Sequence, residues 1–202
     1  MSATLTTAPP SFEAAVSQIR AANFRAELQW AEIAAPRTTA QFTHAIGGGV
    51  SHLQDRNAEP DLDSAEGAGR LILLHDSNSV DSWGSDFRFV CYAQAPLELE
   101  MGDDPFIADV TWSWLLDALN KHGADYTAIS GSATKTISSG YGGLAAAGTG
   151  AQLQIRASWT PCDDNFAAHA EAWAQLLCMM AGLPDSEGVV SLSAHRARKE
   201  RV

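Results

Sequence analysis

The chain has 202 residues, of which 46% are hydrophobic and 18% are charged, and its formal net charge at pH 7 is -11. This length and composition allow one sizeable buried core, and they favour a single domain over residues 11–192. The negative charge argues against a general nucleic-acid binder, because neutralising phosphates requires a basic face. We expect a disordered N-terminus at residues 1–10 and a basic tail at residues 193–202.

No sequence feature directs the chain to a membrane or to an oxidising compartment. The N-terminus lacks the basic and apolar regions of a signal peptide, and no apolar run approaches the roughly 20 residues of a bilayer span. Cys91, Cys162 and Cys178 are widely spaced and odd in number, which fits neither a disulfide framework nor a zinc site. The sequence therefore predicts a cytoplasmic protein without membrane contact.

The first third of the chain predicts a helix followed by short strands. Ser11 follows two prolines and is the expected cap of an amphipathic helix. Strands are expected at residues 27–33 and 41–46, with the second ending before Gly47-Gly48-Gly49. Residues 54–69 are acidic and poor in large apolar side chains, which predicts an exposed, mobile loop before a strand at residues 70–75.

Residues 86–101 show the clearest pattern, because every odd position from Phe87 to Met101 is apolar. A period of two predicts a strand with one face in the core and one in water. Asp104 and Pro105 then mark the expected start of a helix. Trp112 and Trp114 lie on different faces of this helix, so either the helix is buried on two sides or Trp114 contacts a partner.

The last third predicts a hairpin and a final helix. Residues 126–139 are expected to form one strand, 141–150 a loop and 151–159 a second strand whose odd positions face inward. An apolar helix follows Pro161-Cys162-Asp163 and runs to Ala181-Gly182. The fold class is therefore α+β: a two-layer structure in which an antiparallel sheet carries three helices on one face, in the order helix, three or four strands, helix, two strands, helix.

Several short segments resemble a known family. They are Ile33–Pro36, Leu73–Asp76, Trp112–Leu115, Gly142–Leu144, Ile155–Pro161 and Ala181–Pro184. With them the chain resembles the actinobacterial family catalogued as domain of unknown function 3000, over roughly residues 11–192. The resemblance implies no activity and no catalytic residue. The order of elements also resembles the secretion-chaperone-like fold, whose small acidic members bind extended partner segments, often as dimers; this is a likeness of fold alone.

The candidate catalytic motifs are weak. Ser132 and Lys135 match a Ser-x-x-Lys motif, but that motif needs a helix start, whereas these residues lie in a predicted strand. His75 and Asp76, at the end of a strand, are the most site-like pair, because an imidazole beside a carboxylate can act as a base. The acidic pairs at residues 103–104 and 163–164 are explained by helix capping. We predict no catalytic set, no cofactor and no metal site.

The polar face of the sheet is the preferred candidate for binding. Its expected partner-binding residues, together with one tryptophan of the helix, are Arg88, Tyr92, Gln94, Trp114, Gln154 and Arg156. Arginine and tyrosine are enriched in protein interfaces. The leading hypothesis is a non-enzymatic protein-binding or chaperone-like module that binds a protein partner or self-associates as a homodimer. The alternatives are a small enzyme or metabolite-binding protein with a site near His75 and Asp76, and weak nucleic-acid contact through the C-terminal tail.

Overall fold

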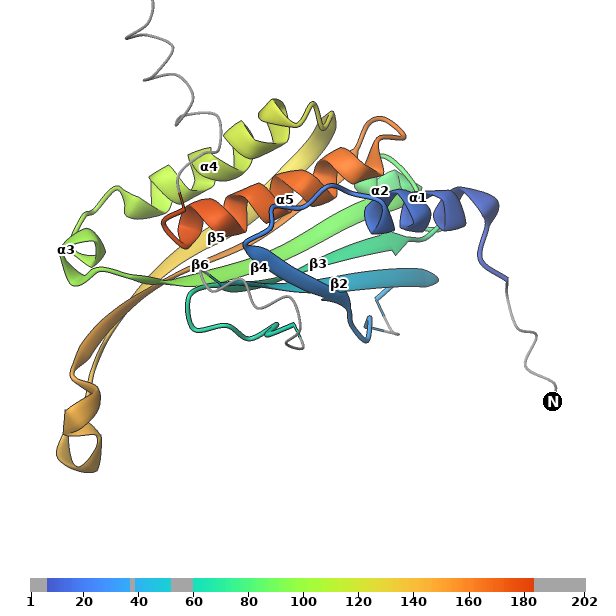
Figure 1. Cartoon of the computed structure of the whole chain (residues 1–202). Helices are drawn as coiled ribbons and strands as arrows, with labels where there is room; N and C mark the ends of the chain where they lie inside the picture. Colours follow the sequence, from blue (N-terminus) through green and yellow to red (C-terminus); the bar gives the residue numbers. More distant parts are fainter. Residues whose placement is uncertain (1–6, 37–38, 52–59, 184–202) are drawn as a thin grey trace, which may run out of the picture.

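The computed structural model describes residues 7–36, 39–51 and 60–183. Within them the chain forms one sheet and a set of helices (Figure 1). The elements are α1 (Pro10–Arg20), β1 (Leu28–Glu32), β2 (Phe42–Val50), β3 (Ala68–His75), α2 (Val80–Trp83), β4 (Phe87–Leu97), α3 (Leu99–Gly102), α4 (Ile107–Lys121), β5 (Tyr126–Ser139), the 3₁₀ helix η1 (Gly142–Ala147), β6 (Thr149–Pro161) and α5 (Phe166–Met180).

The described strands form a six-stranded antiparallel sheet in the order β1-β2-β3-β4-β6-β5. The α+β class and the antiparallel sheet predicted from the sequence are therefore confirmed. The two strongly alternating segments pair directly, with Cys91 of β4 opposite Ala157 of β6 and Tyr92 opposite Arg156. Because paired residues point to the same face, the two segments contribute to the same core face and the same polar face.

Helices α1, α4 and α5 lie over one face of the sheet (Figure 1). α5 contacts β2, β3, β4 and β6, and it is flanked by α1 and α4. The largest side chains of this core, Trp159 of β6 and Trp173 of α5, are fully buried. Burial of apolar surface at about 25 cal/mol per Å² makes this layer the main source of stability.

Strand β2 was expected to end before the glycine run at residues 47–49. Instead, the strand continues through the run to Val50. A methyl group at Gly48 would lie 2.9 Å from Trp173 Cη2, and one at Gly49 would lie 1.8 Å from the carbonyl oxygen of Asp61. The run therefore lets α5 approach β2 from one side and the loop at 60–67 from the other. Close approach of a neighbour is a common reason for glycine inside a strand.

That loop packs more closely than its acidic composition suggests. The Ser64 hydroxyl donates a hydrogen bond to the Val50 carbonyl oxygen at 2.5 Å, and the Asp61 N–H donates to Gln29 Oε1 at 3.0 Å. Residues 60–67 thus contact the sheet through Asp61 and Ser64, although Asp63 between them is 88% exposed, and residues 68–69 belong to β3. The rest of the predicted loop, at 54–59, lies outside the described residues, as does the predicted basic tail.

Three boundaries differ from the expected ones. α1 begins at Pro10, so Ser11 lies inside the first turn and does not cap the helix. β4 ends at Leu97, and the short α3 occupies positions that were expected to continue the strand. Asp104 does not cap α4, which begins at Ile107; its carboxylate accepts the N–H of Phe106 at 2.8 Å in a turn before the helix. Such local aspartate turns compete with capping for the same side chain.

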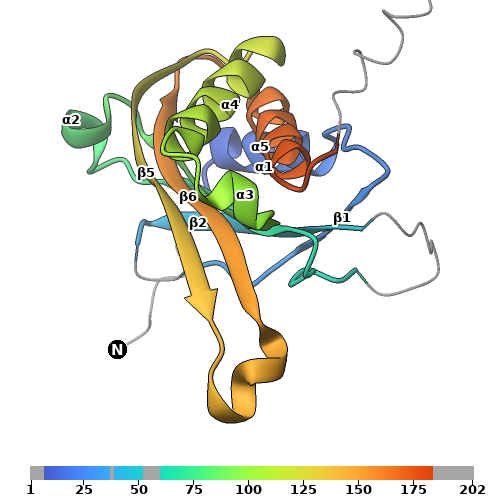
Figure 2. The same ribbon diagram turned by 90° about the vertical axis from the view of Figure 1, so that its left-hand side faces the viewer.

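The β5–β6 hairpin extends beyond the body of the sheet and curves away from the helix layer (Figures 1 and 2). Its outer part, residues 136–152, is called the arm below, and η1 forms its tip. No helix among the described residues is both long enough and apolar enough to cross a membrane.

Candidate functional site

Five of the six predicted partner-binding residues lie together on the face of the sheet that is opposite the helices. Arg88, Tyr92 and Gln94 alternate along β4 with buried residues, and β6 contributes the other two, which pair with β4 in register. Trp114 is not part of this set, because it belongs to α4 and packs on the helix side of the sheet.

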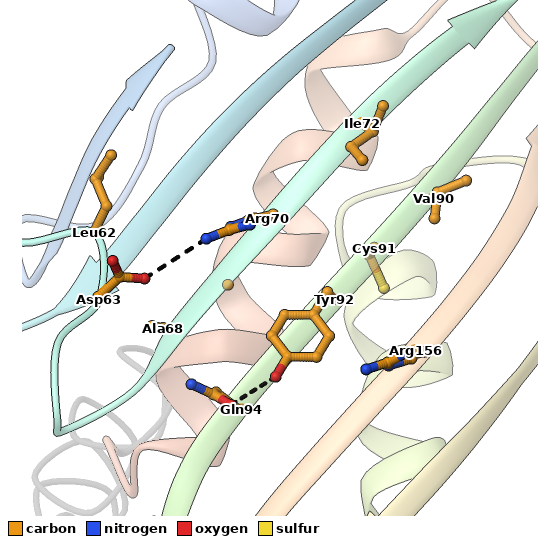
Figure 3. A pocket seen from close by; sticks show the side chains of 11 residues that line it. Leu62, Asp63, Ala68, Arg70, Ile72, Val90, Cys91, Tyr92, Gln94 and Arg156 are labelled. Carbon is orange, nitrogen blue, oxygen red and sulfur yellow. Dashed lines mark hydrogen bonds and ion pairs between the residues drawn. The ribbon is translucent and has the colours of Figure 1, made fainter. Parts of the chain in front are cut away.

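The centre of the polar face is hollowed (Figure 3). This sheet-face hollow has a volume of about 370 Å³. It is lined by Leu62, Asp63, Ala68, Gly69, Arg70, Ile72, Val90, Cys91, Tyr92, Gln94 and Arg156. The loop at 60–67 supplies one wall, and β3, β4 and β6 supply the floor. Its volume falls at the lower end of the range for ligand pockets, so it can accept a few side chains or a small molecule.

Hydrogen bonds fix the tyrosine at the middle of the hollow. The Tyr92 hydroxyl donates to Gln94 Oε1 at 2.6 Å and accepts a hydrogen bond from Gln154 Nε2 at 2.8 Å. The guanidinium of Arg156 lies over the Tyr92 ring, 5.4 Å from its centre. A cation at this distance is attracted to the ring face. Tyr92, Gln94 and Arg156 are therefore held in place by contacts within the protein.

The charges at the rim of the hollow are predominantly positive. Arg70 Nη2 lies 3.7 Å from Asp63 Oδ1, and these side chains are 60% and 88% exposed. Exposed pairs at this separation contribute little binding energy. No carboxylate among the described residues pairs with Arg156. A chain with a net charge of -11 thus presents two arginines, one loosely paired and one without a carboxylate partner, at the same hollow.

Arg88 lies outside the hollow. It donates hydrogen bonds to the hydroxyls of Thr160 at 2.9 Å and Ser158 at 2.8 Å. The Thr160 hydroxyl donates in turn to the carbonyl oxygen of Trp83 in α2, at 2.7 Å. Partial burial lowers the pKa of Arg88 from its ordinary value. The contacts of Arg88 attach α2 to the end of the sheet.

The predicted pairing of His75 with Asp76 is wrong. His75 Nε2 lies 3.1 Å from Asp86 Oδ2, across the connection between β3 and β4. The imidazole is 5% exposed and packs against aromatic rings, including that of Phe87 at 4.8 Å between centroids. Asp76 instead accepts the N–H of Asn78 at 2.9 Å, as aspartates in turns commonly do. A shallow pocket next to Asp86 is lined by neither His75 nor Asp76.

A second buried histidine was not anticipated from the sequence. His169 of α5 is fully buried, and its Nδ1 accepts a hydrogen bond from Trp159 Nε1 at 3.0 Å. Burial lowers its pKa to about 4, although the nearby carboxylates of Asp163 and Asp125 act in the opposite direction. The imidazole is therefore neutral at pH 7 and supports the core.

The cysteines and the Ser-x-x-Lys motif do not have the surroundings of reactive groups. Burial, followed by the charges of Asp125 and Asp163, raises the pKa of Cys162, whereas reactive thiols have lowered pKa values. Lys135 Nζ donates to the carbonyl oxygens of Gly102 at 2.8 Å and Asp104 at 2.9 Å. Its amine therefore holds the end of α3 against β5. In the described part of the chain, no three His, Cys, Asp or Glu side chains form a group that could hold a metal ion.

The sequence contained a usable signal for part of the hollow. Arg70 and Ile72 alternate with Leu71 and Leu73 in β3, so they could have been assigned to the polar face. Nothing in the sequence shows that Leu62 would lie over Gly47, because that contact depends on how the loop folds back over β2.

Comparison with known proteins places the chain in a family. Residues 8–190 match the family model described as protein of unknown function (DUF3000). The chain belongs to this family. The match spans all the elements from α1 to α5, so DUF3000 corresponds to the whole described fold. No curated protein and no solved structure matches the chain. The likeness of the element order to the secretion-chaperone-like fold stays a prediction.

Proposed function

We propose that this DUF3000 protein is a non-enzymatic protein-binding module, chaperone-like in holding a partner segment on the polar face of its sheet. The observation that carries the proposal is the sheet-face hollow, where Arg156 lies over a hydrogen-bonded Tyr92 and has no carboxylate partner among the described residues. Tyrosine and arginine in a pre-ordered pocket are typical of the residues that dominate binding energy at interfaces.

The groups lining the hollow favour recognition over catalysis. Asp63 is 88% exposed, so it lies in water and not in the enclosed surroundings of a catalytic carboxylate. Burial raises the pKa of the Cys91 thiol to about 12, which keeps it protonated and unreactive at pH 7. The hydroxyl of Tyr92 already donates one hydrogen bond and accepts another.

The same groups indicate the chemistry of the partner segment. Arg70 and Arg156 can bind carboxylates, which arginine recognises with paired hydrogen bonds. Ile72 and Val90 line the floor of the hollow and offer contact to an apolar side chain. We propose a segment that carries an acidic residue next to an apolar one.

Replacing both arginines by alanine tests the proposal. Purified, tagged full-length chain should capture its partner from native cell extract, and Arg70→Ala combined with Arg156→Ala should weaken binding at least about 30-fold, because losing one hot-spot residue of an interface costs about 2 kcal/mol or more. Titration of the captured partner measures the change in affinity. Neither arginine is in the core, so the fold should be kept.

Arg20→Ala is the matched control. Arg20 lies at the end of α1, where it pairs with Glu32 away from the hollow, and its side chain is 53% exposed. This variant should bind like the wild type. Undiminished partner binding by the double variant would show that the polar face is not the binding surface.

A further inference from the structure

The exposed large apolar side chains are concentrated at one end of the molecule. Eight such side chains occur among the described residues, and all except Val80 lie on α3, at the start of α4 or on the β5–β6 hairpin. They are Leu99, Met101, Phe106, Val110, Ile137, Tyr141 and Leu144, with Tyr141 81% and Leu144 72% exposed. Apolar side chains gathered in this way commonly mark an interaction site.

The arm is also free of charge. No Asp, Glu, Lys or Arg occurs between residues 136 and 155, in a chain whose net charge is -11. Lys135 is the last charged residue before this stretch, and its amine donates hydrogen bonds to the carbonyl oxygens of Gly102 and Asp104. The arm therefore combines exposed apolar side chains with an absence of charge, so an acidic surface does not repel it.

A receiving surface lies at the same end of the molecule, on the helix side. A groove of about 430 Å³ opens between α3, α4 and the end of α5. It is lined by Pro96, Leu97, Glu98, Met101, Trp114, Leu153, Met179, Met180, Ala181, Gly182 and Leu183. Methionines adapt to the shape of an inserted side chain, and tryptophan supplies a large contact area.

The arm and the groove lie on opposite sides of the sheet. The arm curves away from the helices, whereas α3, α4 and α5 lie in the helix layer (Figures 1 and 2). A two-fold rotation about an axis near this end exchanges the two sides, so that each arm approaches the partner's groove. We propose that two copies of this chain dimerise in this way, with Tyr141 and Leu144 of each arm packing in and beside the groove of the other.

The uncharged arm of a second copy fits this end better than a negatively charged segment does. Glu98, Glu100, Asp103 and Asp104 border the α3 region, and a second acidic surface brought against them would be repelled. The arm adds no negative charge there. Each copy also supplies both the inserting and the receiving surface, which is the self-complementarity that a closed two-fold dimer requires.

Light scattering coupled to size exclusion tests the proposal on the full chain. The wild type should have twice the chain mass of 21.4 kDa. Tyr141→Ser combined with Leu144→Ser should raise the dimer dissociation constant at least about 30-fold, the factor for losing an interfacial anchor. Both side chains are exposed, so the variant should keep the wild-type circular dichroism spectrum. Val80→Ser, at the one described position outside this end that has a large exposed apolar side chain, should leave the dimer intact.

Disulfide trapping tests the pairing of surfaces. Cys162 is exposed, so it is first replaced by serine in all copies. Copies that carry Leu144→Cys are then mixed with copies that carry Met101→Cys and a different tag. Oxidation should link one copy of each kind, and should fail when Val80→Cys replaces Met101→Cys. A monomeric wild type, a dimer that tolerates the arm variant, or the absence of the mixed disulfide would overturn the proposal. The proposal would also be overturned if the chain is monomeric on its own and its arm binds only a different protein.

Discussion

At His169, a single buried side chain couples pH to the stability of the fold. Its folded-state pKa of about 4 is below its ordinary value of 6.5. The stabilisation is therefore fully present above pH 6.5 and is lost as the pH falls toward 4, by on the order of 3 kcal/mol. His169→Asn keeps an acceptor for the Trp159 N–H but cannot take up the proton. We expect its unfolding free energy, measured with denaturant, to fall less steeply than that of the wild type between pH 6.5 and 5.

His44→Asn is the control for this residue. Burial also lowers the pKa of His44, but the side chain is only partly buried. Its replacement should remove a smaller share of the pH dependence. Equal slopes for wild type and His169→Asn in that pH range would mean that His169 is not the source of the effect.

Strand β2 shows why small side chains can be required inside an element. Gly48→Ala places a methyl group against the buried side chains of Trp173 and Leu28, which must shift by a few tenths of an ångström, and this should cost about 1–3 kcal/mol of unfolding free energy. Gly49→Ala meets the backbone oxygen of Asp61, which cannot rotate away. We expect Gly49→Ala to be the more destabilising of the two, and to increase amide hydrogen exchange in residues 60–67.

Gly150→Ala is the comparison, because a methyl group at that position contacts nothing within 4 Å. Its effect should stay within about 0.5 kcal/mol of the wild type. Loss of stability in Gly150→Ala equal to that in Gly49→Ala would indicate that strand propensity, and not close packing, is responsible.

The elements that the sequence predicts well are those in which burial and local pattern agree. β4 and β6 alternate strictly, because one face meets α5 and the other does not. The end of β2 was misplaced, because Gly47 to Gly49 normally interrupt strands and only tertiary contacts explain them here. The hydrogen bond between Trp159 of β6 and His169 of α5 is a single tertiary contact. It could not be predicted, because no periodic pattern in the sequence indicates such a contact.

At the scale of the whole molecule, the arm is separable from the packed body. Replacing residues 139–149 by Asn-Gly would join Ser138 to Gly150, which already face each other in the sheet, through a favoured two-residue turn. None of the described side chains in the removed tip belongs to the hydrophobic core. We expect the unfolding free energy to stay within about 1 kcal/mol of the wild type, while the proposed dimer is lost.

Denaturant unfolding and light scattering on the same sample separate these two effects. A shortened chain that stays dimeric contradicts the proposed role of the arm. A shortened chain that loses several kcal/mol of stability would show that the arm stabilises the body of the fold, and would contradict the inference drawn from its exposed side chains.

The candidate site was predictable only as a face of the sheet. Alternation placed Tyr92, Gln94 and Arg156 together, because register and pleat follow from a period of two. The hollow needs the loop at 60–67 to fold back over β2 and β3, and that loop has no repeating pattern. Trp114 was expected to contact a partner because it lies on a different face of its helix from Trp112, but it belongs to the helix layer and not to the polar face.

The order of the strands has a consequence for synthesis on the ribosome. β1 to β4 can pair one after another as they emerge, but the outer edge of β4 stays open until β6 is made. The central part of the apolar face stays uncovered until α5, the last described element, supplies Trp173, Leu176 and Leu177. Folding should therefore finish only after translation has passed α5, and a nascent chain stalled before residue 166 would expose the part of its interior that α5 covers to chaperones and proteases.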